Sequence, residues 1–169
     1  PYMLWLLYSA FGDDLTFFTR IIVDSPLAIK LLEDYSNELT GEKKKLFDEM
    51  MDWHCIELSK TAITSAEAME DGEPKVVLAS SGMLDAGRGI RWAKKVLPNK
   101  QDCILFVGYA TPNSNAYKIQ NNKSKTIILN GDTTNIKANL VTLRSFSGHM
   151  QRENLLNYYS GINSEVVYL

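Results

Sequence analysis

Two histidines occur in this chain of 169 residues, and one of them, His149, stands in Phe146-Ser147-Gly148-His149. The tetrapeptide follows a strand-like run and opens a predicted helix, a place where a phosphate-handling enzyme can hold an acid at a cleft. A hydrolytic metal centre needs three or more His, Asp or Glu side chains at metal-binding spacing. His54 and His149 are far apart, and neither lies in an HxH, HxxxH or CxxC pattern. The chain therefore carries part of an active site and no metal motif of its own.

A second candidate site is the loop that follows the apolar run 75–79, Ser80-Ser81-Gly82-Met83-Leu84-Asp85-Ala86-Gly87-Arg88-Gly89. Ligands of open α/β sheets lie at the carboxyl ends of strands, where backbone amides and a helix N-terminus can bind an anion. The loop is thus placed to bind a phosphate. The nucleotide pattern G-x-x-x-x-G-K-[ST] begins at Gly82 but meets Arg88 and Gly89 where Lys and a hydroxyl residue must be. This mismatch argues against an NTPase, and a tight strand-to-helix connection also explains the glycines.

Two motifs are equally well explained by helix capping. Asp24-Ser25-Pro26 follows a strand and opens a helix, with Ser25 or Asp24 as the N-cap and Pro26 in the first turn. His149 near a helix N-terminus tends to lose its proton, because the positive end of the helix dipole disfavours imidazolium. A carboxylate from elsewhere would be needed to keep it acidic, so a capping role is the simplest alternative.

Strand-like and helical segments alternate along the chain. The β-branched runs 20–24, 75–79 and 104–107 precede helical patterns at 27–35, 90–96 and 115–120. This alternation predicts βαβ units and a parallel sheet. Runs 125–129 and 136–143 flank Asn130-Gly131, a type I′ turn signal that predicts an antiparallel pair at the edge. The predicted fold class is therefore α/β, a three-layer αβα arrangement with a mainly parallel, doubly wound sheet and an antiparallel edge.

Further elements are predicted at the two ends of the chain and in a charged segment. The apolar stretch 1–11 is shorter than the roughly 18 residues of a membrane-spanning helix, so it predicts a first helix that packs on protein. The segment 38–52 is charged on one face and predicts a solvated helix with a buried stripe. A last helix is expected over 150–159 and a strand over 165–169, where the chain ends as an excised segment would.

The composition is that of an ordinary globular domain, with 45% hydrophobic and 22% charged residues. The formal net charge of −2 excludes a global basic field, so any phosphate binding must come from a local site. Cys55 and Cys103 show no disulfide spacing, and Cys103 lies in an apolar run that predicts a buried thiol. Free thiols indicate a reducing compartment, and no secretory signal is visible, so a cytoplasmic location is expected.

Four motifs occur in the order and approximate spacing of one known family. They are Ile21-Ile22-Val23-Asp24-Ser25-Pro26-Leu27-Ala28, Ala79-Ser80-Ser81-Gly82-Met83-Leu84-Asp85-Ala86-Gly87-Arg88, Ile104-Leu105-Phe106-Val107-Gly108-Tyr109 and Phe146-Ser147-Gly148-His149. Together they resemble the β-CASP metallo-β-lactamase family, which contains RNA-processing nucleases such as the pre-mRNA 3′-end endonuclease and the J-type ribonucleases. The resemblance implies that residues 1–169 form a single β-CASP domain, part of a larger protein in which it closes over the zinc site of a metallo-β-lactamase fold.

The resemblance also implies roles for particular residues. His149 matches the motif B histidine, which protonates or stabilises the departing oxygen during phosphodiester hydrolysis. The residues expected to bind substrate in the RNA cleft are Ser80, Ser81, Gly82, Arg88, Ser147 and Gly148. Arg88 could instead tie its loop to the sheet. Zinc would be held by ligands outside this chain, so the fragment alone is expected to bind no zinc and to be inactive.

The chain departs from the family pattern after Gly108-Tyr109. Many relatives continue with a Gly-Thr-Leu-Gly-Arg type segment, whereas this chain has Thr111-Pro112-Asn113-Ser114-Asn115-Ala116-Tyr117-Lys118, which lacks two glycines and an arginine. Two alternatives to a catalytic domain stay open: a non-catalytic RNA-binding or protein-interaction module, and a stand-alone α/β protein that binds a small phosphorylated ligand at 80–89. The expected partners are RNA and a metallo-β-lactamase domain of the same polypeptide, without a membrane; homodimerisation is left open.

Overall fold

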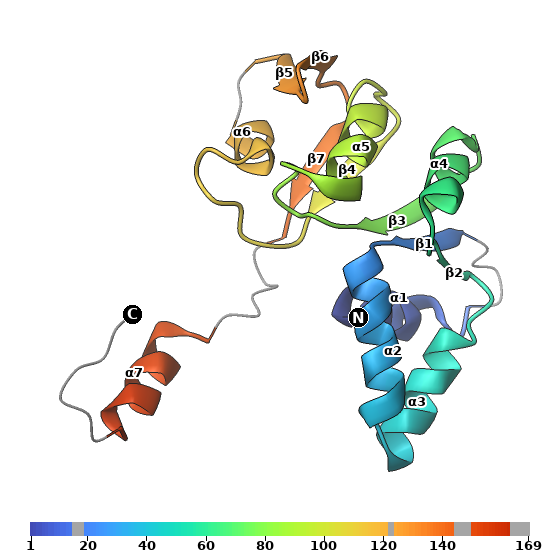
Figure 1. The fold of residues 1–169 in the computed structure, drawn as a ribbon, viewed down its shortest axis with the longest axis vertical. Coiled ribbons are helices and arrows are strands. Elements are labelled where there is room, and N and C mark those ends of the chain that lie inside the picture. Colours follow the sequence, from blue (N-terminus) through green and yellow to red (C-terminus); the bar gives the residue numbers. More distant parts are fainter. Residues whose placement is uncertain (15–18, 122–123, 144–149, 163–169) are drawn as a thin grey trace.

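The computed structural model describes residues 1–14, 19–121, 124–143 and 150–162 (Figure 1). In chain order its elements are α1 (Tyr2–Phe11), β1 (Arg20–Asp24), α2 (Pro26–Glu38), α3 (Gly41–Met51), β2 (Ile56–Leu58), α4 (Ala62–Glu70), β3 (Lys75–Ala79), α5 (Gly87–Val96), β4 (Cys103–Phe106), α6 (Asn115–Asn121), β5 (Thr126–Leu129), β6 (Asp132–Asn135), β7 (Asn139–Thr142) and α7 (Arg152–Ser160). Among the helices described, none is long and apolar enough to span a membrane.

A three-stranded parallel sheet in the order β2-β1-β3 forms the first half of the fold. The central strand β1 is buried on both faces, which explains its continuous apolar run Ile21-Ile22-Val23. Ile21 and Val23 pack into a core with residues of α1, α2 and α3, while Ile22 lies on the opposite face with α4. Helices therefore cover both faces of this sheet, and the predicted α/β fold with mostly parallel strands is confirmed (Figure 1).

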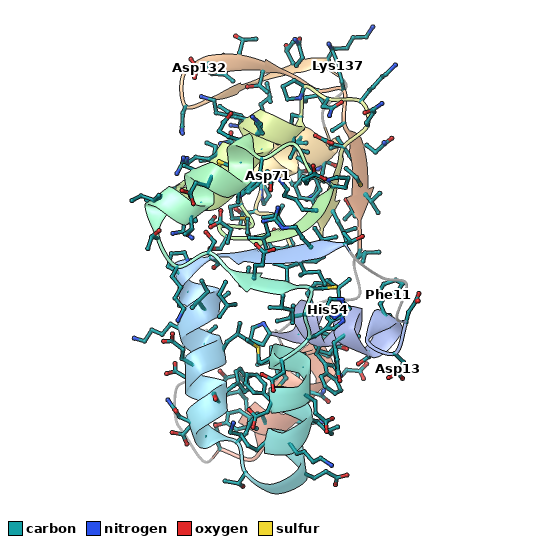
Figure 2. All side chains as sticks on the ribbon, turned by 90° about the vertical axis from the view of Figure 1, so that its right-hand side faces the viewer. Phe11, Asp13, His54, Asp71, Asp132 and Lys137 are labelled. Atoms are coloured by element: carbon teal, nitrogen blue, oxygen red, sulfur yellow. The ribbon has the colours of Figure 1, made fainter. Side chains whose placement is uncertain are left out.

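The second half contains two strand pairs around another core. β4 and β7 pair in parallel, and β5 and β6 pair antiparallel. Their core contains buried residues from α5, α6, β4, β5 and the loops that join them, among them Ile90, Leu97, Phe106, Ile119 and Leu129. Figure 2 shows His54 near α1, and Asp132 and Lys137 at one end of the molecule, away from α1.

The predicted hairpin is present, but its second strand differs from the predicted one. Asn130 and Gly131 both have positive φ, 50° and 84°, as the type I′ turn requires. The strand after the turn is β6, whereas the later part of the predicted run 136–143 forms β7 and pairs with β4. The division arises because the amides of Lys137 and Ala138 donate to the Leu97 carbonyl, at 2.8 and 3.0 Å, and so leave the ladder.

The prediction of a buried Cys103 is wrong. Ile104 and Phe106 face the core, so their neighbours Cys103 and Leu105 point to the other face of the β4–β7 pair, where both are exposed. Cys55, by contrast, is buried, and burial raises the pKa of its thiol. The predicted strand over 165–169 lies outside the described residues.

Candidate functional site

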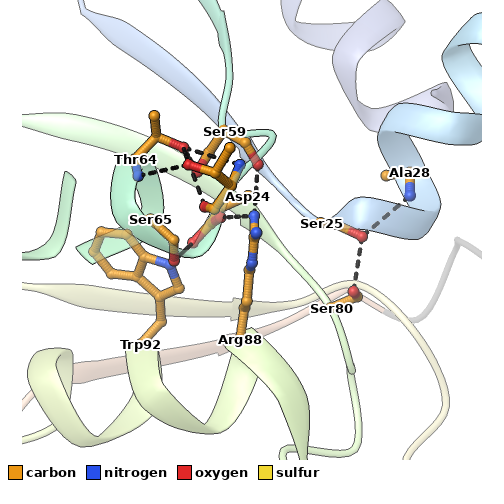
Figure 3. Close-up of polar contacts among 10 residues, drawn as sticks. Asp24, Ser25, Ala28, Ser59, Thr64, Ser65, Ser80, Arg88 and Trp92 are labelled. Atoms are coloured by element: carbon orange, nitrogen blue, oxygen red, sulfur yellow. Dashed lines mark hydrogen bonds and ion pairs between the residues drawn. The ribbon is translucent and has the colours of Figure 1, made fainter. Parts of the chain in front are cut away.

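Two serines meet where β1 and β3 end. The strands are parallel neighbours with Asp24 opposite Ala79, so Ser25 and Ser80 emerge at the same carboxyl edge. Their hydroxyl oxygens lie 2.7 Å apart, within hydrogen-bond distance (Figure 3). Ser25 is also the N-cap of α2, because its oxygen accepts from the Ala28 amide at 3.1 Å and Pro26 opens the helix. The predicted cap is thus confirmed, with Ser25 rather than Asp24 in that position.

Asp24, the residue before that cap, has no exposed surface and is enclosed by polar partners. Its carboxylate accepts hydrogen bonds from the Ser65 hydroxyl at 2.7 Å and the Trp92 indole at 2.6 Å (Figure 3). It also forms an ion pair with the Arg88 guanidinium, whose side chain is only 13% exposed. The same Arg88 nitrogen donates to the Ser59 carbonyl at 2.5 Å. The network therefore joins the end of β1 to the β2–α4 connection, α4 and α5.

Asp24 is held in its charged form. Burial by itself would raise its pKa, but hydrogen bonds from Trp92, Ser65 and Ser59, together with the Arg88 charge, lower the pKa below its ordinary value. The negative charge that results is neutralised inside the chain by Arg88. Neither group of this pair is therefore available as an acid or base at the surface.

The loop between β3 and α5 folds tightly against its own helix. The Gly89 amide donates to the Ser80 carbonyl at 2.6 Å, and the Leu84 amide donates to the Ser81 carbonyl at 3.1 Å. A Cβ at Gly89 would lie 2.5 Å from the Ser81 carbonyl oxygen, so only glycine fits there. Gly87 has φ of +70°, which glycine adopts without steric cost. These contacts hold Ser80 and Ser81 at the rim of the loop, beside the carboxyl ends of β1 and β3, and leave Gly82 exposed.

The loop after β4 is fastened to the first half of the β3–α5 loop. The Ala116 amide donates to the Met83 carbonyl at 2.9 Å. Asn115 donates from its backbone to Asp85 Oδ1 and from its side chain to the Leu84 carbonyl, both at 2.9 Å. The N-terminus of α6 therefore adjoins the loop that carries Ser80 and Gly82.

The structure brings together some of the predicted site residues. Ser80, Ser81 and Gly82 lie in the β3–α5 loop, and Arg88 follows them in the first turn of α5. The Arg88 guanidinium contacts Asp24 and Ser59, which is the alternative role of tying this segment to the sheet. RNA binding by Arg88 stays a prediction. His149, Ser147 and Gly148 lie outside the described residues, so their place beside this loop also stays a prediction.

Within residues 1–14, 19–121, 124–143 and 150–162, no three His, Cys, Asp or Glu side chains are grouped so that they could hold a metal ion. Asp24 does not fit a zinc site either, because its carboxylate is enclosed by Arg88, Ser65 and Trp92. The described residues at the edge supply hydroxyl groups, exposed backbone and the carboxylate of Asp85, which accepts a hydrogen bond from the Asn115 amide.

Parallel strands, helices on both faces and two serines in contact at the strand ends define an α/β domain. The family model described as Beta-Casp domain matches residues 2–119, more than half of the chain. The chain belongs to the Beta-Casp domain family, and the predicted family resemblance is confirmed.

Three relatives illustrate this membership. Transcription termination factor FttA of Methanocaldococcus jannaschii is 33% identical over 132 residues, which are 73% of this chain and 21% of that protein. FttA of Pyrococcus abyssi is 30% identical over 100 residues, 57% of this chain and 15% of that protein. Ribonuclease TTHA0252 of Thermus thermophilus is 30% identical over 153 residues, 83% of this chain and 34% of that protein. The chain thus matches between 15% and 34% of the length of these relatives.

Asp24→Asn is expected to lower the free energy of unfolding by about 3–5 kcal/mol at pH 7, because it leaves the Arg88 guanidinium buried without a counter-charge. Urea unfolding followed by circular dichroism measures this. Glu70→Gln is the control, since it removes an exposed partner of Lys95 and should change stability by less than about 1 kcal/mol. Equal effects of the two substitutions would contradict the role given to Asp24.

The same variant changes the acid sensitivity of the protein. Because the pKa of Asp24 is lowered on folding, its stabilisation is complete above the unfolded value of about 3.9 and is lost as pH falls through the folded value. Wild type should therefore lose more stability than Asp24→Asn as the pH falls below about 4. Asp71, whose pKa is lowered to about 2 by the Glu73 amide and Arg20, titrates in both proteins and does not affect the comparison. Parallel unfolding curves across this range would refute the assignment.

Gly89→Ala is expected to destabilise the fold by about 1–3 kcal/mol, even though alanine favours a helix over glycine by about 1 kcal/mol. The new methyl group would meet the Ser81 backbone, which cannot yield without moving the loop. Gly82→Ala in the same loop is the control, since a Cβ there meets nothing within 4 Å. Thermal unfolding compares the two, and a stabilised Gly89→Ala would show that the close approach is absent.

Proposed function

We propose that this chain forms one wall of the RNA cleft of a zinc-dependent RNA hydrolase, a ribonuclease that cleaves phosphodiester bonds. The observation that carries the proposal is the meeting of Ser25 and Ser80 at the carboxyl edge of two parallel strands, the edge where open α/β sheets bind ligands. Family membership supports it, because a relative over 83% of the chain is named a ribonuclease. Another relative is named transcription termination factor FttA.

The groups at this edge suit contact with a phosphodiester backbone. Hydroxyl groups and backbone amides are common donors to phosphate oxygens, and they position a nucleic acid without reading its sequence. Ser80 and Ser81 supply hydroxyls at the rim, and the exposed Gly82 lets the substrate approach the backbone. Arg88 is engaged with Asp24, so these neutral donors orient the strand, and cations elsewhere supply most of the affinity.

His149 is assigned the role of general acid or hydrogen-bond donor to the departing oxygen, on the strength of its match to motif B. A positioned acid-base group contributes about 10²- to 10⁴-fold to a reaction rate. Zinc, which activates water for hydrolysis in such sites, is assigned to ligands outside this chain, within a metallo-β-lactamase domain of the same polypeptide. The fragment alone is accordingly proposed to be inactive.

His149→Ala in the full-length parent protein should lower the single-turnover rate of RNA cleavage by about 10²- to 10⁴-fold. Affinity for uncleavable RNA should stay nearly unchanged, because it rests on phosphate contacts distributed along the cleft. His54→Ala is the matched control, since His54 is exposed near α1 and should alter neither quantity (Figure 2).

An unchanged cleavage rate in His149→Ala would remove the catalytic role and leave helix capping as the explanation of this histidine. A parent protein that binds RNA but cleaves none, even when its metal content is complete, would instead identify a non-catalytic RNA-binding module.

A further inference from the structure

The segment that departs from the family pattern forms a pocket of its own. A cavity of about 380 Å³ lies between the loop after β4, α6 and β5, lined by Pro112, Asn113, Tyr117, Lys118, Asn121 and Ile127. Its volume is near the lower end of the range of roughly 300–1,000 Å³ that small-molecule pockets occupy. The cavity thus suits a single planar group rather than a helix or an extended peptide.

The pocket continues the edge at which RNA is proposed to bind. Asn115 and Ala116, at the start of α6, are hydrogen-bonded to Met83, Leu84 and Asp85 of the β3–α5 loop. A strand that passes Ser80 and Gly82 would therefore meet the α6 surface next. This argument rests on the proposed function, because it extends the same substrate along the same edge.

The lining groups have the chemistry of a nucleotide site. Tyr117 is 39% exposed, and the helix beneath it is anchored by the buried Ala116 and Ile119. Anchoring matters because a ring on a fixed backbone loses little conformational freedom when a base stacks on it. Among the described residues, the side chains of Lys118 and Asn113 have no polar partner, which leaves an ammonium and an amide available to a ligand.

We propose that this pocket binds one base of single-stranded RNA, which stacks on Tyr117 while Lys118 neutralises an adjacent phosphate. Stacking on an aromatic side chain beside a cation is the usual means of binding single strands without sequence preference. The lining surface is mainly apolar, and the polar groups of Asn113, Tyr117, Lys118 and Asn121 lie around it. This combination suits a base and its phosphate better than it suits an apolar peptide. The segment 111–118 lacks the glycines of the family pattern, but it carries side chains, Tyr117 and Lys118, that can bind a nucleotide.

The test measures binding of the full-length protein to a fluorescein-labelled, uncleavable 2′-O-methyl RNA strand by fluorescence anisotropy at several salt concentrations. Tyr117→Leu should weaken binding by about 5- to 150-fold, the range for losing one stacked base, with no change in salt dependence. Tyr117→Phe should bind like wild type because it keeps the ring. Lys118→Ala should lower the slope of log K against log salt by about 0.7, the value for one phosphate contact on a single strand.

Tyr35→Leu is the matched control, because it also removes an exposed tyrosine ring. Tyr35 is 47% exposed and lies near the C-terminal end of α2, away from the Ser25 cap. It should leave RNA binding unchanged, and thermal unfolding of each variant checks that the fold is retained. A strand of the same length without bases should bind wild type and Tyr117→Leu equally.

The outcomes separate this inference from the proposed function. Wild-type binding of RNA with an unaffected Tyr117→Leu would overturn the base pocket and leave the RNA cleft intact. No binding of RNA by the wild-type protein would overturn both. Equal losses in Tyr117→Leu and Tyr117→Phe would show that the hydroxyl, not stacking, is used. Binding of an acidic peptide that requires Tyr117 and Lys118, with RNA binding unaffected, would assign the pocket to a protein partner.

Discussion

The buried ion pair between Asp24 and Arg88 is the interaction on which the strand-end edge depends. A charged carboxylate at the end of the central strand is costly unless other groups satisfy it. Arg88, Ser65 and Trp92 do so from α5 and α4, which fixes both helices relative to β1. Because Arg88 lies in the first turn of α5, the pair also sets where the preceding loop turns. Ser80 is thereby brought to Ser25.

Because the Arg88 charge is paired with Asp24 inside the domain, it is not available at the surface to bind a ligand. Arg88, the basic residue that follows the β3–α5 loop, is turned inward, so the loop presents hydroxyls, backbone and the exposed Asp85 carboxylate but no cationic side chain of its own. Neutral donors orient a polyanion but add little long-range attraction. With a net charge of −2, the chain as a whole does not attract nucleic acid either. The attraction between this edge and a polyanion therefore depends on individual exposed lysines near the edge, such as Lys118.

Sequence patterns predicted β1 and β3 but missed β2 and α4, for reasons that lie in the residues of each element. β1 and β3 coincide with the predicted runs 20–24 and 75–79, because strands covered on both faces are continuously apolar. β2 was missed because it has three residues, Ile-Glu-Leu, too few to show a period. α4 was missed because its capping box has Thr64 in place of the usual Glu or Gln, so the pattern for a helix start is absent.

The Asp24 network could not have been predicted from the chain alone, and the reason is physical. Asp24 and Arg88 are separated by 64 positions, and each has a sufficient local explanation, in a cap and in a loop. Only the parallel pairing of β1 with β3 brings them together, and pairing is set by the whole hydrophobic pattern rather than by either residue. The same holds for Met83 and Ala116, whose backbones meet across two loops. Local motifs thus identify which residues belong to an edge. The pairing of the strands determines which of these residues face outward and which form the contacts that stabilise the edge.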